Sequence, residues 1–274
     1  LIFFSNYFVI RKIAMTLIIG ANLNHYTIIA ADTRTSWWHP LLGKWQHRDH
    51  DHKIAMCKMG LVTGSGYSKA LDSVKEELLK KEIYHTNEVL KIINELAIPE
   101  IELLNKYDPN IKDNTCFLIS YFTSSDNEKI LRLSIFLHSK WKYQLYIIKE
   151  PYIIMPSDTN KKHYEKHNKI LNEGLHRFKE CKYSEKEYIA SVVTNIYKNT
   201  IFFAECFYEI SKISNFVSGD FDFAAFLSND MVLYGYGDTK EVKSGKLRFR
   251  FLHSSNQTRI LTPDILKEGD IINT

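Results

Sequence analysis

Short apolar runs rich in β-branched residues alternate with polar turns at the start of the chain. Residues 16–22 and 26–32 are two such runs, and polar residues separate them. Two short apolar runs joined by a polar turn are typical of a β-hairpin with buried strands. Residues 53–59 and 60–64 repeat the pattern, so we expect a second hairpin there.

Two long segments after the Gly64-Ser65-Gly66 sequence have helical spacing. Within residues 65–81 the apolar side chains fall on one face, and lysines and glutamates fill the other. Residues 85–107 carry a similar apolar stripe. Pro99 lies inside this second segment, and it predicts a kink or an interruption because proline has no backbone N–H to donate.

The rest of the chain returns to strand-like patterns, then helical ones, and then strands again. The predicted strands and helices, in chain order, are strands 115–122, 129–137, 143–148 and 152–155, helices 161–178 and 184–213, and strands 221–227, 231–236 and 246–253. Segregated blocks of this kind favour sheets packed on sheets with helices outside, rather than alternating βαβ units. Because no linker rich in Pro, Gly or Ser divides the chain, we expect residues 16–274 to form one domain. A long carboxy-terminal extension follows Asp238.

Composition places the chain among globular proteins. It is 45% hydrophobic and 25% charged, which is too apolar for intrinsic disorder. The formal charge of +4 is mild and its charges are interspersed, so a nucleic-acid partner gains little support. No apolar run reaches the length of a membrane-spanning helix. The cysteines Cys57, Cys116, Cys181 and Cys206 have neither CxxC nor zinc-finger spacing, which is typical of reduced thiols in a cytoplasmic protein.

The first fifteen residues have three possible explanations. Residues 1–10 are apolar and precede Arg11 and Lys12, whereas a secretory signal has its positive charge first. The segment is therefore a short pro-segment, a weak export signal, or upstream sequence that precedes a true start at Met15. Removal of Met15 would expose Thr16 as the amino-terminal residue.

Thr16 is the candidate nucleophile of a hydrolase that needs no cofactor. A threonine hydroxyl requires a base, and a free α-amino group has a pKa near 8 and can take the proton. A buried lysine would add positive charge beside the hydroxyl, and Lys53 is the candidate. Asp32 would hold that lysine in place. The backbone N–H of Gly64 could face a developing oxyanion.

The motifs around these residues resemble the start of a mature proteasome β-subunit. In that family an amino-terminal threonine opens a strand, a glycine lies four residues on, and a second strand ends in Ala-Ala-Asp-x-Arg. Here Thr16, Gly20, Asp32 and Arg34 occupy these positions, and Thr16 and Asp32 have the family's spacing of sixteen residues. Lys53-Ile54 and the glycine turn at Gly64 follow in the family's order. The resemblance is strong over residues 15–80 and weaker but collinear beyond.

The resemblance implies a fold, an activity and an assembly. The fold would be the four-layer αββα sandwich of the N-terminal-nucleophile (Ntn) hydrolases, an α+β class with two antiparallel sheets. The activity would be that of a threonine peptidase acting on peptide or amide bonds. The chain would form a homo-oligomeric ring with its active sites facing an enclosed chamber, which an ATPase unfoldase could serve.

The resemblance also implies a set of site residues. Catalytic roles fall to Thr16, Asp32, Lys53, Gly64, Ser157, Asn215 and Ser218, and substrate-binding roles to Arg34, Ser36 and Gly64. The pattern is less regular at two of these positions. The glycines around the family's serine are missing at Ser157, and Asn215 stands where the family has an aspartate, so it carries no charge.

Other interpretations remain open. Thr16 could be an ordinary strand residue, Lys53 a solvated lysine, and Gly64 only a turn glycine. The chain could be a small-molecule amidase on the same fold, or a non-catalytic structural subunit. The segment between Asp32 and Lys53 is about five residues longer than in the family. Its histidines and aspartates could bind zinc, although such a run is more often a solvated loop, and we predict no metal site. Its Trp37-Trp38 pair could line a substrate pocket or a subunit contact.

Overall fold

A computed structural model describes most of the chain after residue 15. The described residues are 16–39, 42–57, 59–81, 85–125, 128–137, 144–177, 185–228, 232–239, 248–252 and 258–261. The expectations for residues 1–15 and for Cys181 fall outside these ranges.

The first sheet is antiparallel and has seven strands in the order β10-β1-β2-β11-β12-β13-β14. Its strands are β1 (Ile18–Asn22), β2 (Tyr26–Asp32), β10 (Tyr152–Ile154), β11 (Asp220–Leu227), β12 (Val232–Asp238), β13 (Arg248–Leu252) and β14 (Thr258–Leu261). The β1–β2 pairing confirms the first predicted hairpin. The carboxy-terminal extension continues this sheet beyond β12, and it contains the unpredicted strand β14.

The second sheet is also antiparallel and has five strands in the order β5-β6-β7-β8-β9. Its strands are β5 (Ala55–Cys57), β6 (Gly60–Ser65), β7 (Cys116–Ser125), β8 (Glu128–Leu137) and β9 (Tyr146–Ile147). The β5–β6 pairing confirms the second predicted hairpin, with a first strand shorter than expected.

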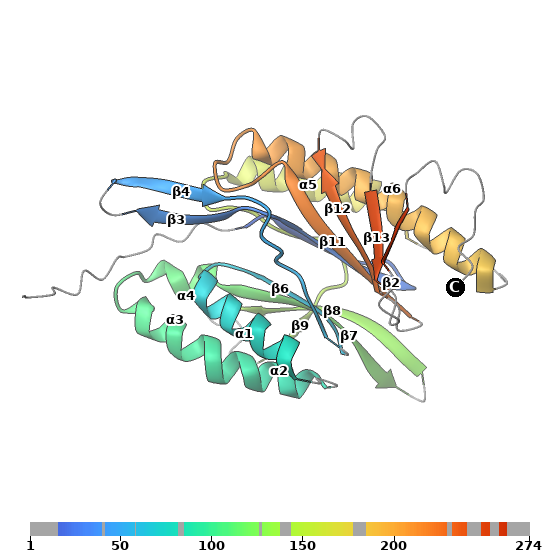
Figure 1. Ribbon diagram of the computed structural model, residues 1–274, viewed down its shortest axis with the longest axis horizontal. Helices are drawn as coiled ribbons and strands as arrows, with labels where there is room; N and C mark the ends of the chain where they lie inside the picture. The colour runs from blue at the N-terminus through green and yellow to red at the C-terminus, as the bar shows by residue number, and fades with distance from the viewer. Residues whose placement is uncertain are drawn as a thin grey trace, which may run out of the picture.

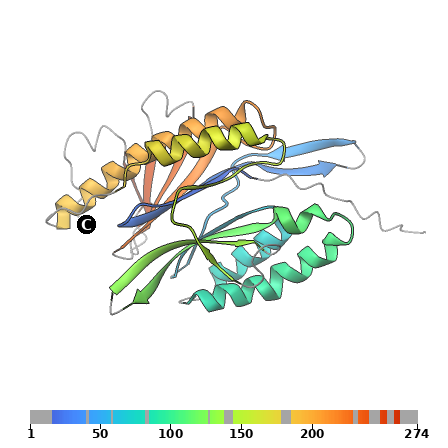
Figure 2. The same cartoon turned by 180° about the vertical axis from the view of Figure 1, so that it is seen from behind.

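Helices cover the outer face of each sheet (Figure 1, Figure 2). The helices on the five-stranded sheet are α1 (Ser68–Lys80), α2 (Thr86–Ile92), α3 (Ile98–Asn105) and the short, unpredicted α4 (Asn110–Asn114), and those on the seven-stranded sheet are α5 (Lys161–Gly174) and α6 (Glu185–Ser211). One buried apolar cluster lies under each group of helices. A third cluster contains residues of both sheets, so the sheets pack face to face. The α+β class with antiparallel sheets is confirmed.

Pro99 interrupts its helix as predicted. A π-helical segment, η1 (Ile93–Ala97), separates α2 from α3, and Pro99 lies in the first turn of α3. Proline cannot donate the hydrogen bond that would continue an α-helix, and a local π-helical turn accommodates the lost bond.

The two sheets approach each other closely at Gly20 on β1. A Cβ atom there would lie 2.6 Å from the Leu118 side chain and 3.1 Å from that of Leu133, both on the opposite sheet. Glycine is therefore required by space at this position. The close approach brings the start of β1 near the second sheet.

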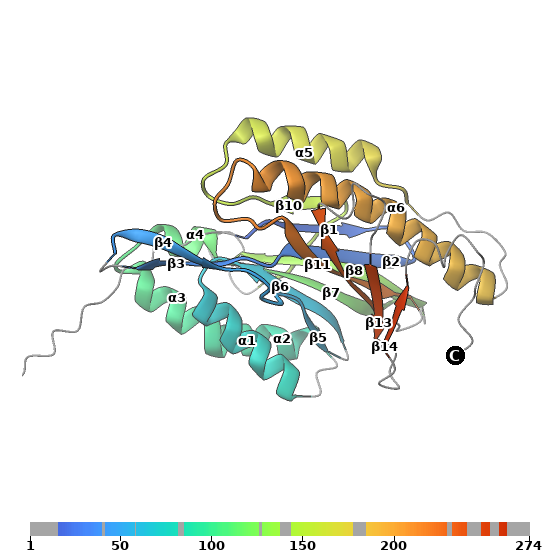
Figure 3. The same ribbon diagram turned by 45° about the horizontal axis from the view of Figure 1, so that its top comes forward.

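The long segment after Asp32 contains a hairpin that was not predicted, whereas the histidines and aspartates at residues 49–52 lie in a partly exposed loop, as expected. The hairpin forms a two-stranded sheet of its own, β3 (Thr35–His39) and β4 (Lys44–Arg48), which extends beyond the rest of the molecule (Figure 1, Figure 3). Gly43 takes a positive φ of 59° at the turn, a conformation that glycine adopts at little cost. The Trp45 ring packs edge-on against Phe216, with ring centroids 4.8 Å apart, and this contact ties the hairpin to the body. Among the helices described, none is long and apolar enough to cross a membrane.

Candidate active site

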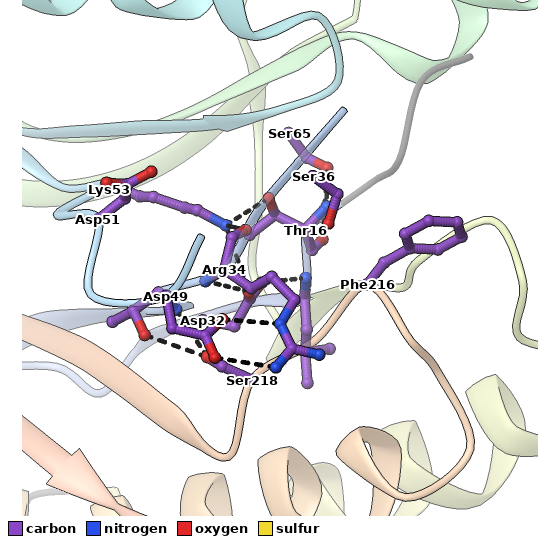
Figure 4. Close-up of polar contacts among 12 residues, drawn as sticks. Thr16, Asp32, Arg34, Ser36, Asp49, Asp51, Lys53, Ser65, Phe216 and Ser218 are labelled. Atoms are coloured by element: carbon purple, nitrogen blue, oxygen red, sulfur yellow. Dashed lines mark hydrogen bonds and ion pairs between the residues drawn. The ribbon is translucent and has the colours of Figure 1, made fainter. Parts of the chain in front are cut away.

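Lys53, two residues before β5 of the opposite sheet, reaches the Thr16 hydroxyl. Its Nζ lies 2.9 Å from Thr16 Oγ1 and 3.2 Å from Asp32 Oδ1, and it also donates to the Arg34 carbonyl (Figure 4). An ammonium group has three N–H donors, and these three acceptors use all of them. Thr16, Asp32 and Lys53 are all buried. The structure thus brings together three residues that the sequence assigned to one site.

Asp32 is held rigidly at the end of β2. Its Oδ2 accepts the backbone N–H of Leu17 at 2.9 Å, and its Oδ1 accepts that of Arg34 at 2.8 Å. The carboxylate is completely buried. A buried charge requires partners of this kind, because it has lost its contact with water. Asp32 therefore fixes both the position of Lys53 and the backbone next to Thr16.

Burial governs the pKa values of this pair. It lowers the pKa of Lys53, and attraction to Asp32 opposes that shift. Burial also raises the pKa of Asp32, against the charge of Lys53 and the N–H donors of Arg34 and Leu17. A lysine with a lowered pKa can share a proton with a neighbouring hydroxyl, and in its charged form it stabilises an alkoxide on that oxygen.

Ser65 also contacts Thr16, and the sequence analysis missed it. Its Oγ accepts the Thr16 backbone N–H at 3.0 Å and donates to the Thr16 carbonyl at 3.3 Å. Ser65 is completely buried at the end of β6. One sequence feature could have identified Ser65 as a site residue: it directly follows Gly64, which ends a predicted strand and was already assigned to the site. The hydroxyl that contacts the Thr16 nitrogen in the structure is therefore that of Ser65.

Gly64 lies at the wall of the same site. It lines a pocket together with Thr16 and Lys53. A Cβ atom at Gly64 would lie 2.5 Å from the Leu71 side chain and 2.7 Å from the Cys116 carbonyl oxygen. Packing alone therefore requires glycine at this position, whatever its backbone N–H contributes to chemistry.

The other three predicted catalytic residues lie apart from the Thr16 hydroxyl. Ser157 is exposed. The Ser218 Oγ accepts the Thr33 N–H at 3.1 Å and donates to the Asp220 carbonyl at 2.6 Å. Asn215 is exposed, and its backbone carbonyl accepts a hydrogen bond from Arg34 at 3.0 Å. Within the described part of the chain, no hydrogen bond joins any of the three to Thr16.

The two further substrate-binding candidates face the pocket, which has a volume of about 340 Å³. The Arg34 guanidinium forms a two-pronged contact with Asp49, at 2.7 and 2.9 Å. The Ser36 Oγ lies 2.7 Å from His47 Nδ1. The lining residues are Thr16, Arg34, Thr35, Ser36, Trp37, Arg48, Lys53, Gly64, Gly66, Tyr67, Ser68, Leu71, Asp72, Lys75 and Phe216. Trp37 therefore lines a pocket beside Thr16, which agrees with one of the two roles that the sequence analysis gave to the Trp37-Trp38 pair.

The histidines of the inserted segment are engaged in separate contacts. His52 Nδ1 lies 2.8 Å from the buried Asp222, and His50 Nδ1 lies 3.5 Å from Asp220. Over the residues that the structure covers, no group of three His, Cys, Asp or Glu side chains is arranged to hold a metal ion. Burial raises the pKa of the Cys116 thiol to about 12, so this cysteine stays protonated and belongs to the core.

Comparison with solved structures gives a similarity of fold. The chain is similar to the structure titled "Anbu (Gly-1) mutant" from Hyphomicrobium sp. strain MC1, with a TM-score of 0.50 and 12% sequence identity. The match covers 79% of this chain and 84% of that one. No protein-family model matches the chain, and no curated protein does. At 12% identity the likeness concerns the fold alone.

Proposed function

We propose that this chain is a proteasome-like threonine peptidase with the four-layer sandwich of the Ntn hydrolases. The observation that carries the proposal is the 2.9 Å contact between Lys53 Nζ and Thr16 Oγ1, with Asp32 buried behind the lysine. A lone threonine hydroxyl is a poor nucleophile, and a buried ammonium group at hydrogen-bond distance lowers the energy of its alkoxide. The layered arrangement of sheets and helices and the likeness to Anbu support the fold.

The reaction requires Thr16 to be the first residue of the active protein. Its freed amine would take the hydroxyl proton, directly or through water, as Oγ1 attacks the substrate carbonyl. Collapse of the resulting intermediate expels the amine product and leaves an ester on Thr16. Water then hydrolyses the ester and restores the threonine. Throughout the cycle, Lys53 would supply positive charge to the nucleophile and Asp32 would hold Lys53.

Intact-mass measurement combined with one substitution tests the proposal. We expect the active protein to begin at Thr16 and to cleave a fluorogenic peptide, and Thr16→Ala to abolish cleavage. Thr194→Ala is the matched control, because it removes an exposed threonine hydroxyl on α6 that does not line the pocket. Cleavage by the Thr16→Ala protein at the wild-type rate would exclude Thr16 as the nucleophile. A chain that keeps Met15 in place would instead favour a non-catalytic subunit.

Assembly and substrate size belong to the same proposal. A ring of identical chains would enclose the active sites, and an unfoldase could deliver substrates to it. Light scattering of the purified protein would give the number of subunits. Comparison of fluorogenic peptides with small amides would distinguish the peptidase from an amidase on the same fold.

A further inference from the structure

Three segments build the walls of the pocket beside Thr16. Helix α1 contributes Ser68, Leu71, Asp72 and Lys75, which lie at the spacing of one helix face. The β3–β4 hairpin and the residues before it form a second wall, and Phe216 closes the third side. The pocket therefore lies directly next to the hydroxyl that would attack a substrate, where the side chain of the attacked residue must fit.

Positive charge predominates among the described residues of these walls. Four cations line the pocket, whereas Asp72 is the one carboxylate among its described lining residues. Helix α1 also begins at the pocket with Ser68, and its first turn contains no acidic residue. The partial positive charge of a helix N-terminus adds to that of the side chains.

Lys75 is the cation with room for a new partner. Arg34 is engaged by Asp49, Arg48 by Asp51, and Lys53 by Thr16 and its other acceptors. The Lys75 side chain is 20% exposed, and its Nζ lies 2.8 Å from Asp72, whose side chain is 56% exposed. An ion pair with so exposed a carboxylate contributes little stability, so it can open at little cost. A substrate carboxylate that entered the pocket could take the place of Asp72.

The position of Lys75 relative to the reacting centre supports this role. Its charge is close enough to Lys53 to lower the pKa of that lysine. A negative charge bound to Lys75 would therefore lie near the nucleophile and would offset this repulsion. The apolar faces of Trp37, Tyr67 and Leu71 would contact the methylene groups that lead to the carboxylate.

We propose that the pocket accepts an acidic side chain, so that the enzyme cleaves after Asp or Glu, with Lys75 as the specificity-determining residue. This inference rests on the proposed peptidase function. It goes beyond that function by naming the substrate class and the side chain that selects it.

A matched set of peptides tests the preference. Four fluorogenic peptides would differ only in the residue before the scissile bond, which is Glu, Gln, Leu or Lys. We expect kcat/KM for the Glu peptide to exceed that for the Gln peptide by roughly 10-fold, the effect of one hydrogen bond to a charged group. The Lys peptide would be the poorest substrate. The ratio should fall as salt screens the charges.

Substitutions on α1 locate the source of the preference. Lys75→Met should bring the Glu/Gln ratio close to one while cleavage of the Leu peptide continues, and Lys75→Arg should keep the preference. Lys80→Met is the control, because Lys80 lies on the same helix, is 69% exposed and does not line the pocket. Equal cleavage of the Glu and Gln peptides by the wild type, or an unchanged ratio in Lys75→Met, would overturn the proposal.

A binding measurement separates this inference from the peptidase proposal. The Thr16→Ala protein should bind an uncleaved Glu peptide more tightly than the Gln peptide, as measured by fluorescence anisotropy. If the wild type cleaves none of the four peptides, the peptidase proposal fails, and the binding ratio still decides whether the pocket prefers an acid. Equal binding of the two peptides would refute the preference whatever the enzyme's activity.

Discussion

The polar side chains around Thr16 are buried together, whereas Ser157, Asp158 and Asn215, in the turn before α5 and the loop before β11, are exposed. In the first region the buried groups of Lys53, Asp32 and Thr16 form a continuous set of hydrogen bonds. In the second, Asp158 accepts the Ser214 hydroxyl at 2.6 Å and the Asn215 N–H at 3.2 Å.

The difference shows where chemistry is possible. Charges buried together depend on one another, since none can turn to water, and removing one leaves its partner uncompensated. Asp158 lies at the surface, where its hydrogen bonds join the turn before α5 to the loop before β11 without contacting Thr16. We therefore assign chemistry to the first region and support of the frame to the second.

Lys53→Met should separate the two regions most sharply. It removes the positive charge beside the Thr16 hydroxyl, so we expect kcat to fall about 10²- to 10³-fold, the usual effect of losing one electrostatic group from an active site. Lys69→Met is the control, because Lys69 lies on α1 with an exposed partner, Glu100. A Lys53→Met enzyme with wild-type kcat would refute the assignment.

The pH dependence of activity should report the ionisation of Lys53. Lys53 must be protonated to stabilise the alkoxide, and burial places its pKa below the ordinary value of 10.5. Activity should therefore rise as the Thr16 amine loses its proton, and it should fall again as Lys53 deprotonates at a pH below 10.5. A profile of kcat/KM that stays level to pH 10.5 would contradict this sequence of ionisations.

Ser65→Ala should have a smaller effect, on the order of 10-fold in kcat. Ser65 would orient the Thr16 nitrogen, and its loss leaves that nitrogen without its hydroxyl partner. Because an acceptor that favours the ammonium form is removed, the acid limb of the profile should also move to lower pH. Ser73→Ala, on the exposed side of α1, should change neither. If Ser65 had a purely structural role, the acid limb of the profile would stay at the same pH.

Asn215→Asp should have the smallest effect of all. The residue is exposed, so restoring the carboxylate typical of the family should leave kcat/KM within about 2-fold, as for most surface substitutions. A large increase in kcat/KM would show that this side chain reaches the Thr16 amine in the working enzyme. The loop before β11 would then be part of the catalytic centre.

Local pairing explains why the Thr16 region could be predicted. Thr16 and Asp32 lie at the same end of one hairpin, where the Asp32 N–H bonds to the Leu17 carbonyl, so their proximity follows from strand pairing. The prediction that Lys53 lies beside Thr16 also required the spacing of the proteasome family, because Lys53 precedes a strand of the other sheet. The spacing of apolar residues along the chain was sufficient to predict the strands β1 and β2 and the helix α1.

Contacts between distant segments explain what was missed. Ser65 meets Thr16 only because the sheets pack face to face, and strand periodicity gives no information about that contact. The β3–β4 hairpin packs against the body through Trp45 and Phe216, which are far apart in the sequence. The positions of Ser157 and Asn215 depend on loop conformations, which short motifs do not determine.

The narrow base of the β3–β4 hairpin makes it a replaceable module. The Asp51 N–H donates to the Thr33 carbonyl at 2.9 Å, and Arg34 pairs with Asp49, so the two arms are clamped together before they enter the frame. We expect changes in length or sequence beyond these two contacts to leave Asp32 and Lys53 in place. Grafting a different hairpin tip would thus re-engineer one rim of the pocket and leave the reacting atoms in place.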